Sequence, residues 1–167
     1  SNLVNMIDVE FNYKSSFDKI SSKSSRYIEE CFYKSLKLIK NKSDKFIIIN
    51  GPISKKSFLK KKYLGITEYL ATKTKSKNEV MLIYNKNLSV VPLTTHIPIK
   101  LVANNINKKR IFNAVFKISK FYREVLNKEA KIAVLSLNPH CETTLNFSEE
   151  EKIIVPSLKF LKKKGIN

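Results

Sequence analysis

The sequence is poor in glycine, cysteine, histidine and arginine, and it contains no tryptophan. Its two cysteines, Cys31 and Cys141, form neither a disulfide framework nor a Cys-x-x-Cys metal knuckle. Its three glycines build no G-x-G-x-x-G fingerprint and no Walker loop, although NAD enzymes do not all use those folds. No apolar run reaches the roughly 18 residues of a membrane span, and no charged-then-apolar leader opens the chain. We therefore expect a soluble, cytoplasmic protein.

The strongest bias in composition is positive charge. The formal net charge is +18, but only three of the 32 basic residues are arginines, namely Arg26, Arg110 and Arg123. Nucleic-acid recognition usually relies on arginine forks and interleaved aromatic residues, whereas the lysines here are scattered along the whole chain. We interpret the charge as a solvated surface that also suits a phosphorylated small-molecule substrate. A basic nucleic-acid-binding module is the alternative function.

The stretch KIAVLSLNPHCE, residues 131–142, organises the interpretation of the rest. Its apolar part, residues 132–137, is short and continuous, which predicts a strand buried on both faces of a parallel or mixed sheet. Ligands of α/β proteins bind at the carboxyl edge of the sheet, so His140 is expected at a site. The other histidine, His96, has an equivalent setting, after the run 88–95 and before a proline.

His96 and His140 are candidate ligands of one divalent metal ion. Neutral imidazoles suit zinc, cobalt or iron, and strand exits are rigid supports. The alternative is that each imidazole only hydrogen-bonds within its own turn. Two ligands hold a divalent ion poorly, so a third is needed. Within the chain Cys141 and Glu142 are available; otherwise the third ligand comes from another chain or from a segment outside this sequence.

Periodicity and turn signals predict helices interspersed with strands. The expected helices cover about 25–41, 55–61, 66–73 and 107–126, with a last one that begins at the capping box Ser148-x-x-Glu151 and ends at Gly165. Pro156 is expected to kink the last helix. The expected strands are 45–50, 80–84, 88–93 and 132–137, with the middle two joined as an antiparallel hairpin.

These elements predict an α/β fold, a three-layer lobe with a mixed sheet. We divide the chain into an N-terminal segment with the first helix, residues 1–44, and an α/β core that carries both histidines, residues 45–167. The whole chain is expected to form one compact body.

Two loops are further candidates for anion binding. Lys55 follows the predicted strand 45–50 through Gly51-Pro52, so it could meet an anion at the sheet edge, although it is equally one more surface lysine. The block GITE, residues 65–68, would present the Thr67 hydroxyl and helix-start amides to a phosphate. By composition alone this block is only the beginning of a helix.

Four blocks, in order, resemble the 4-hydroxythreonine-4-phosphate dehydrogenases of vitamin B6 (pyridoxal phosphate) biosynthesis. They are GPISKKSFL, GITEYLA, TTHIPIKLV, and LNPHCE followed by SEEEKIIVPSLKFLKKKG. They lie in family order over roughly residues 46–165, and the pair TTHxP and LNPH is specific. The resemblance covers about half of the family's length. We therefore expect a central fragment of a two-lobed enzyme that is inactive by itself.

The resemblance implies a truncated α/β subunit, similar to the isocitrate and isopropylmalate dehydrogenases, that works as a homodimer. His96 matches the histidine of TTHxP and His140 that of LNPH, two of the family's three metal ligands; the third comes from the partner subunit. Thr67 matches the threonine of the family's G-H-T-E block, which binds substrate. Ile66 replaces the histidine of that block, so its polar contact to substrate is lost or supplied elsewhere.

The reaction implied by the resemblance is NAD-dependent oxidation of 4-phosphooxy-L-threonine, followed by decarboxylation of the resulting β-keto acid. A divalent metal ion (zinc, cobalt or magnesium) assists the reaction, and NAD accepts the hydride. The resemblance assigns no catalytic acid or base within this chain and no NAD contacts.

Overall fold

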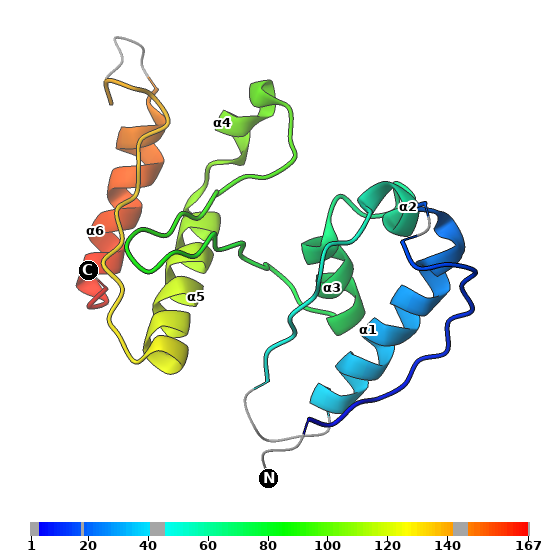
Figure 1. Cartoon of the computed structure of the whole chain (residues 1–167). Coiled ribbons are helices and arrows are strands. Elements are labelled where there is room, and N and C mark those ends of the chain that lie inside the picture. Colours follow the sequence, from blue (N-terminus) through cyan, green and yellow to red (C-terminus); the bar gives the residue numbers. More distant parts are fainter. Residues whose placement is uncertain (1–3, 18, 41–45, 142–146, 167) are drawn as a thin grey trace. The chain divides into compact units, whose positions relative to one another are not determined.

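The structure, a computed structural model, describes residues 4–17, 19–40, 46–141 and 147–166. The chain divides into two compact units, Ser1–Lys77 and Asn78–Asn167. Figure 1 shows α1, α2 and α3 in the first unit and α4, α5 and α6 in the second. The predicted division at residue 44 stays a prediction.

The first unit is built from short helices joined by polar turns. They are η1 (Ser22–Ser24), α1 (Ser25–Lys40), α2 (Lys55–Leu59) and α3 (Ile66–Thr74). Ser54 caps α2, since its hydroxyl accepts a hydrogen bond from the Ser57 amide at 3.4 Å. Lys60 and Lys75 adopt left-handed backbone conformations and end α2 and α3. These helices confirm the predicted ones at 25–41, 55–61 and 66–73 to within two residues at each end.

Aromatic rings form the core of the first unit. Phe32 on α1 and Tyr69 on α3 have ring centroids 5.3 Å apart, and both are almost fully buried. Phe58 and Tyr63 contact the same tyrosine, at 5.1 Å and 5.3 Å between centroids. Such pairs stabilise by about 0.5–1.5 kcal/mol beyond the area they bury. The cluster therefore holds three short helices that would not be stable alone.

The second unit is built around two longer helical segments. Its elements are η2 (Ile99–Leu101), α4 (Val102–Asn105), α5 (Lys108–Leu126), the π-helical turn η3 (Glu150–Ile154) and α6 (Val155–Lys163). Asn107 caps α5, since its side-chain oxygen accepts from the Arg110 amide at 3.0 Å. The predicted helix 107–126 is confirmed. Pro156 lies inside a continuous helical run, since the π-turn η3 passes directly into α6, and its missing N–H interrupts the ladder where the helix changes from π to α form. The predicted kink stays a prediction.

Aliphatic side chains form the core of the second unit. Its buried members are Ile106, Ile111, Val115, Ile154 and Leu161. Helices α5 and α6 pack against each other, and the extended segment between them runs back along α6 (yellow to orange in Figure 1). This segment contributes Ile132, Val134 and Leu137 to the rim of the core. The residues just before His140 are therefore anchored to the helices.

The predicted α/β lobe with a mixed sheet is wrong. Within the described ranges no sheet forms, and pairing is limited to an isolated antiparallel bridge between Ile83 and Val90, with N–H···O distances of 2.9 and 3.0 Å. This bridge is what remains of the predicted hairpin; Asn85 closes its turn by accepting from the Asn87 amide at 2.9 Å.

The other predicted strands form no ladder with a neighbouring strand within the described residues. In the segment 46–50, Ile47 is 76% exposed and Ile49 is 91% exposed; Lys45 lies outside the described residues. In the segment 132–137, Leu135 is 83% exposed, so one face packs on the core and the other is open, in contrast to the predicted burial of both faces. An apolar run favours an extended chain, but a strand also needs a hydrogen-bonded neighbour. Among the described residues, none of the helices combines the length and hydrophobicity of a membrane-spanning segment.

Candidate functional site

His140 stands in a tight turn at the end of the extended segment 131–136. The Cys141 amide donates to the Asn138 carbonyl at 3.1 Å, and Cys141 adopts a left-handed conformation with φ 57°. Ser136 braces the same turn, because its hydroxyl donates to the Asn138 carbonyl at 2.8 Å. His140 itself is exposed. The turn therefore fixes its own backbone and leaves the imidazole accessible. We call residues 137–141 the His140 turn.

A buried carboxylate accepts hydrogen bonds from the His140 turn. Glu150, in η3, is only 5% exposed. Its Oε1 accepts hydrogen bonds from the backbone amides of Leu137 and Asn138, both at 2.9 Å. Its Oε2 accepts from the Ser148 hydroxyl at 3.0 Å and from Asn138 Nδ2 at 3.2 Å. Both oxygens are thus surrounded by donors, and the turn is tied to the helix that carries the aliphatic core.

These donors change the acidity of the buried group. They lower the pKa of Glu150 from its ordinary 4.5 to about 2, chiefly through the hydrogen bond from the Asn138 amide, against the opposing effect of burial. Donors directed at a carboxylate favour its charged form. Glu150 is therefore a carboxylate throughout the physiological pH range.

His96 stands in a different local setting. Its backbone is left-handed, with φ 57°, and its side chain is exposed. After Pro98 the chain enters η2, where the Leu101 amide donates to the Pro98 carbonyl at 2.9 Å. A non-glycine residue in this conformation is uncommon and is typical of turns and functional sites. A local role for each imidazole, hydrogen bonding within its own turn, has no support among the described residues, where neither ring has a partner.

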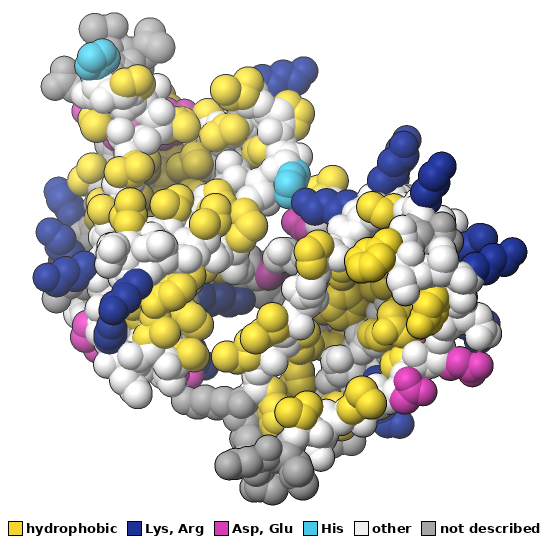
Figure 2. All heavy atoms as spheres, in the orientation of Figure 1, with side chains coloured by type: hydrophobic (Ala, Val, Ile, Leu, Met, Phe, Trp, Pro, Cys, Tyr) yellow, Lys and Arg dark blue, Asp and Glu magenta, His cyan; other side chains and the backbone are white. Residues whose placement is uncertain are grey.

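The two histidines do not form a complete metal centre in the described part of the chain. Among the described residues, no group of three or more histidine, cysteine, aspartate or glutamate side chains could hold a metal ion. Figure 2 shows histidine side chains as separate cyan patches rather than one cluster. Cys141 is exposed beside His140, whereas Glu142, the other candidate for a third ligand, lies outside the described residues. The assignment of His96 and His140 as ligands stays a prediction.

The candidate anion-binding residues belong to the first unit. Lys55 is exposed at the first position of α2. Thr67 is exposed in the first turn of α3, while Ile66 is half-buried against the aromatic cluster. Ile66 therefore acts as a packing residue in the place where the resembling family carries histidine. The carboxylate of Glu68 lies close over Gly65, since a Cβ added to this glycine would stand 2.9 Å from Glu68 Oε2.

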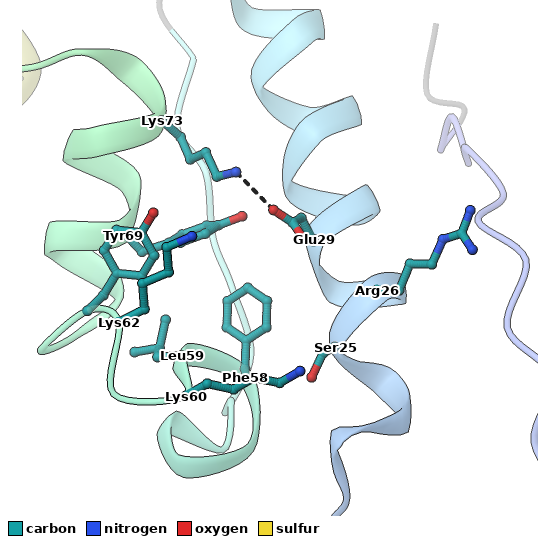
Figure 3. A pocket seen from close by; sticks show the side chains of 10 residues that line it. Ser25, Arg26, Glu29, Phe58, Leu59, Lys60, Lys62, Tyr69 and Lys73 are labelled. Carbon is teal, nitrogen blue, oxygen red and sulfur yellow. Dashed lines mark hydrogen bonds and ion pairs between the residues drawn. The ribbon is translucent and has the colours of Figure 1, made fainter.

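A cavity in the first unit contains none of these predicted residues. It measures about 320 Å³ and is lined by residues of α1, α2, α3 and the turn after α2, including Arg26, Lys60, Lys62 and Tyr63 (Figure 3). Across it, Lys73 Nζ lies 2.9 Å from Glu29 Oε1, which lowers the pKa of Glu29 and raises that of Lys73. The cavity is basic and half-open, and one of its cations is already neutralised by a carboxylate.

Sequence reasoning missed Glu150, the best-supported polar residue of the His140 turn. The capping box at Ser148 pointed to Glu151, and the Glu151 amide does donate to Ser148 Oγ at 3.4 Å. The buried acid is nevertheless the preceding residue. The run of three glutamates, 149–151, at the beginning of the last helical segment was the available signal.

Comparison with known proteins gives this arrangement a family. The model of the family described as "Pyridoxal phosphate biosynthetic protein PdxA" matches residues 2–167. The chain belongs to the PdxA family. The resemblance noted from the motif blocks is thereby confirmed.

Relatives within the PdxA family carry two names. The chain is 34% identical over 168 residues to 4-hydroxythreonine-4-phosphate dehydrogenase of Sulfurihydrogenibium sp., which covers 98% of this chain and 51% of that protein. It is 40% identical over 124 residues to the enzyme of the same name from Aquifex aeolicus, covering 71% of this chain and 38% of that protein. It is also 34% identical over 106 residues to D-threonate 4-phosphate dehydrogenase of Pectobacterium atrosepticum, covering 63% of this chain and 32% of that protein.

A solved structure matches the fold as well. The crystal structure of 4-hydroxythreonine-4-phosphate dehydrogenase from Klebsiella pneumoniae aligns with a TM-score of 0.71 at 27% identity, over 89% of this chain and 46% of that chain. The chain thus spans about half the length, or less, of the PdxA-family proteins that it matches.

Proposed function

We propose that this chain contributes to an NAD-dependent dehydrogenase that oxidises and decarboxylates 4-phosphooxy-L-threonine in pyridoxal phosphate biosynthesis. The observation that carries the proposal is the match of residues 2–167 to the PdxA family. The relatives named 4-hydroxythreonine-4-phosphate dehydrogenase are enzymes, so we do not propose the alternative of a nucleic-acid-binding module. We expect the whole enzyme to act in the cytoplasm as a homodimer.

Two side chains of the second unit have donor atoms that suit a divalent ion such as zinc, cobalt or magnesium. Two ligands are nevertheless too few for a complete site. The imidazoles of His96 and His140 are exposed, and nitrogen donors of this kind suit zinc and cobalt better than magnesium. Since a protein site needs at least about three ligands, these two can form only part of the site. The chemistry that such an ion supplies when bound is polarisation of the substrate oxygen at which oxidation occurs. The contribution of this chain is to hold two imidazoles on fixed turns.

Substrate recognition in this proposal rests on the first unit and on charge. A net charge of +18 raises the local concentration of a substrate that carries phosphate and carboxylate groups. The Thr67 hydroxyl is exposed at the beginning of α3, where helix amides favour an anion. Lys55, also exposed, is the basic residue that we would test beside it.

The identity of the substrate has a second candidate within the family. The D-threonate 4-phosphate dehydrogenase of Pectobacterium atrosepticum matches this chain at 34% identity over 106 residues, and the Sulfurihydrogenibium relative matches at 34% over 168 residues. Both names describe a phosphorylated four-carbon hydroxy acid, and Ile66 removes a polar side chain beside Thr67 relative to the G-H-T-E block. The site therefore has fewer polar groups with which to distinguish the two substrates.

Turnover tests the proposal when the chain is joined to the part of the Sulfurihydrogenibium enzyme that it does not match. With NAD and Zn²⁺, the chimera should reduce NAD in the presence of 4-phosphooxy-L-threonine, and the rate with D-threonate 4-phosphate gives the substrate preference. The 167-residue chain by itself should show no turnover. Substitution of His140 by Gln should abolish activity of the chimera.

Two results would contradict this proposal. One is a folded chimera that is inactive with both substrates. The other is undiminished activity after either His140→Gln or His96→Asn. A matched control is Lys128→Gln, which removes an exposed cation on the turn after α5 and should leave the rate unchanged.

A further inference from the structure

Glu150 is linked to the His140 turn by several hydrogen bonds. Glu150 follows Asn138 by 12 residues in the sequence, yet its two oxygens accept from four donors, two of them backbone amides of the turn. The same residue begins η3, whose last residue, Ile154, belongs to the buried aliphatic core. The carboxylate thus connects a solvent-exposed turn to the buried core of the unit.

The pattern of donors requires a carboxylate at this position. Oε1 accepts from two N–H groups, while Oε2 accepts from a hydroxyl and an amide nitrogen. A glutamine has the same shape, but its NH₂ group would face donors on one side, and it would leave buried groups unpaired. The next acid, Glu151, is exposed and does not replace it.

We infer that Glu150 is a positioning residue: its buried carboxylate fixes the backbone of Leu137 and Asn138 and thereby presents His140 in one orientation to a divalent cation. The inference rests on the proposed function for the identity of what His140 binds. The π-helical form of η3 agrees with it, since such turns are rare and occur frequently at functional sites. Residues that orient a metal ligand typically change metal affinity by about 10- to 100-fold when substituted.

The test compares Glu150→Gln with Glu151→Gln in the full chain. Each variant removes one negative charge from the same helix start, but only the first removes the contacts to the turn. In Glu150→Gln we expect amide hydrogen exchange at Leu137 and Asn138 to become at least about 10-fold faster, and the backbone order parameter of His140 to fall. Zn²⁺ affinity, measured by calorimetry on the chimera with the rest of the Sulfurihydrogenibium enzyme, in its unaltered form and with each substitution, should fall by about 10- to 100-fold in Glu150→Gln alone.

The outcomes separate this inference from the proposed function. Unchanged exchange at both amides, or an unchanged order parameter at His140, would overturn the positioning role whether or not Zn²⁺ binds. A looser turn with equal Zn²⁺ affinity in both variants would also overturn it. If the unaltered chimera binds no Zn²⁺, the metal-dependent function fails, and the exchange and order measurements on the chain alone decide the positioning role.

A second variant covers the case in which Glu150→Gln does not fold. Asn138→Ala keeps the carboxylate and both backbone contacts but removes the Nδ2 donor. It should raise exchange at Leu137 by a smaller factor, roughly 2- to 5-fold. No change in this variant, together with an unfolded Glu150→Gln, would reduce Glu150 to a residue needed only for folding.

Discussion

The two units stabilise short helices and exposed turns by different means. The first unit relies on stacked and tilted aromatic rings around Tyr69, and its ion pair between Lys73 and Glu29 is exposed to solvent. The second unit relies on an aliphatic core, with a buried carboxylate, Glu150, that has every oxygen occupied by donors. The comparison teaches that a charge contributes to a turn when it is buried and saturated with hydrogen bonds, whereas a charge at the surface contributes little.

Removing a ring of the aromatic cluster should give the largest loss of stability. Phe32→Ala empties a site that is 5% exposed, so the free energy of unfolding should fall by about 3–5 kcal/mol. Hydrogen exchange resolved to residues should locate the loss in α1, α2 and α3. The matched control is Tyr33→Ala, the neighbouring residue, which is 58% exposed and should cost under about 1 kcal/mol. Equal losses in the two variants would contradict the aromatic core.

Acid should weaken the second unit through Glu150. The pKa of this carboxyl is lowered to about 2 from 4.5, so its contribution is complete above about pH 4.5 and is lost as the pH falls toward 2. At pH 7, Glu150→Gln should lower the free energy of unfolding by about 2–3 kcal/mol, because it leaves buried donors unpaired. Denaturant titrations should show the gap between wild type and variant narrowing as the pH falls from 7 to 3. A gap that is constant over this range would refute the role of the charge.

A cap in the second unit should have an intermediate effect. Asn107→Ala removes the acceptor for the Arg110 amide and should destabilise α5 by about 1 kcal/mol. Asn107→Ser keeps a capping oxygen and should restore most of this loss. Thermal denaturation of the three proteins measures the difference; if serine and alanine behave alike, the cap carries no weight.

The exposed ion pair of the first unit should have the smallest effect. Lys73→Met should change stability by under about 0.5 kcal/mol, and the change should vanish in concentrated salt. A double-mutant cycle with Glu29→Gln isolates the pair. A coupling energy above about 1 kcal/mol would break the contrast between the two units.

Local signals allowed much of the helical structure to be predicted. The cap at Asn107 and the seam of α5 depend on residues three or four positions apart, so the sequence carries them directly. The predicted sheet failed for the opposite reason, since residues 46–50 and 132–137 have the hydrophobicity of strands but form no bridge to another strand within the described residues. Pairing between distant segments is not encoded in either segment alone.

Part of the candidate site could be predicted from local motifs, and part of it depends on contacts between distant residues. Motif blocks led to His96, to His140 and to a family resemblance; the family model confirms the resemblance, and the roles of the two histidines stay predictions. The motif blocks did not lead to Glu150, because the choice among three consecutive glutamates is made by a π-turn and by contact with residues 12 and 13 positions earlier. The composition of the chain does not indicate the π-turn or these contacts.

The left-handed backbone at His96 limits how this position can vary through mutation. At φ 57°, a residue with a branched Cβ would clash with its own carbonyl, whereas asparagine, aspartate and glycine are accommodated. Every single-nucleotide replacement of this histidine loses the imidazole, and proline is also excluded by the backbone, because its ring fixes φ near about −65°. Asparagine and aspartate remove the imidazole but still accommodate the left-handed backbone. They are therefore the replacements that evolution can accept most readily at this position, and the ones that test the loss of a ligand without a change of backbone.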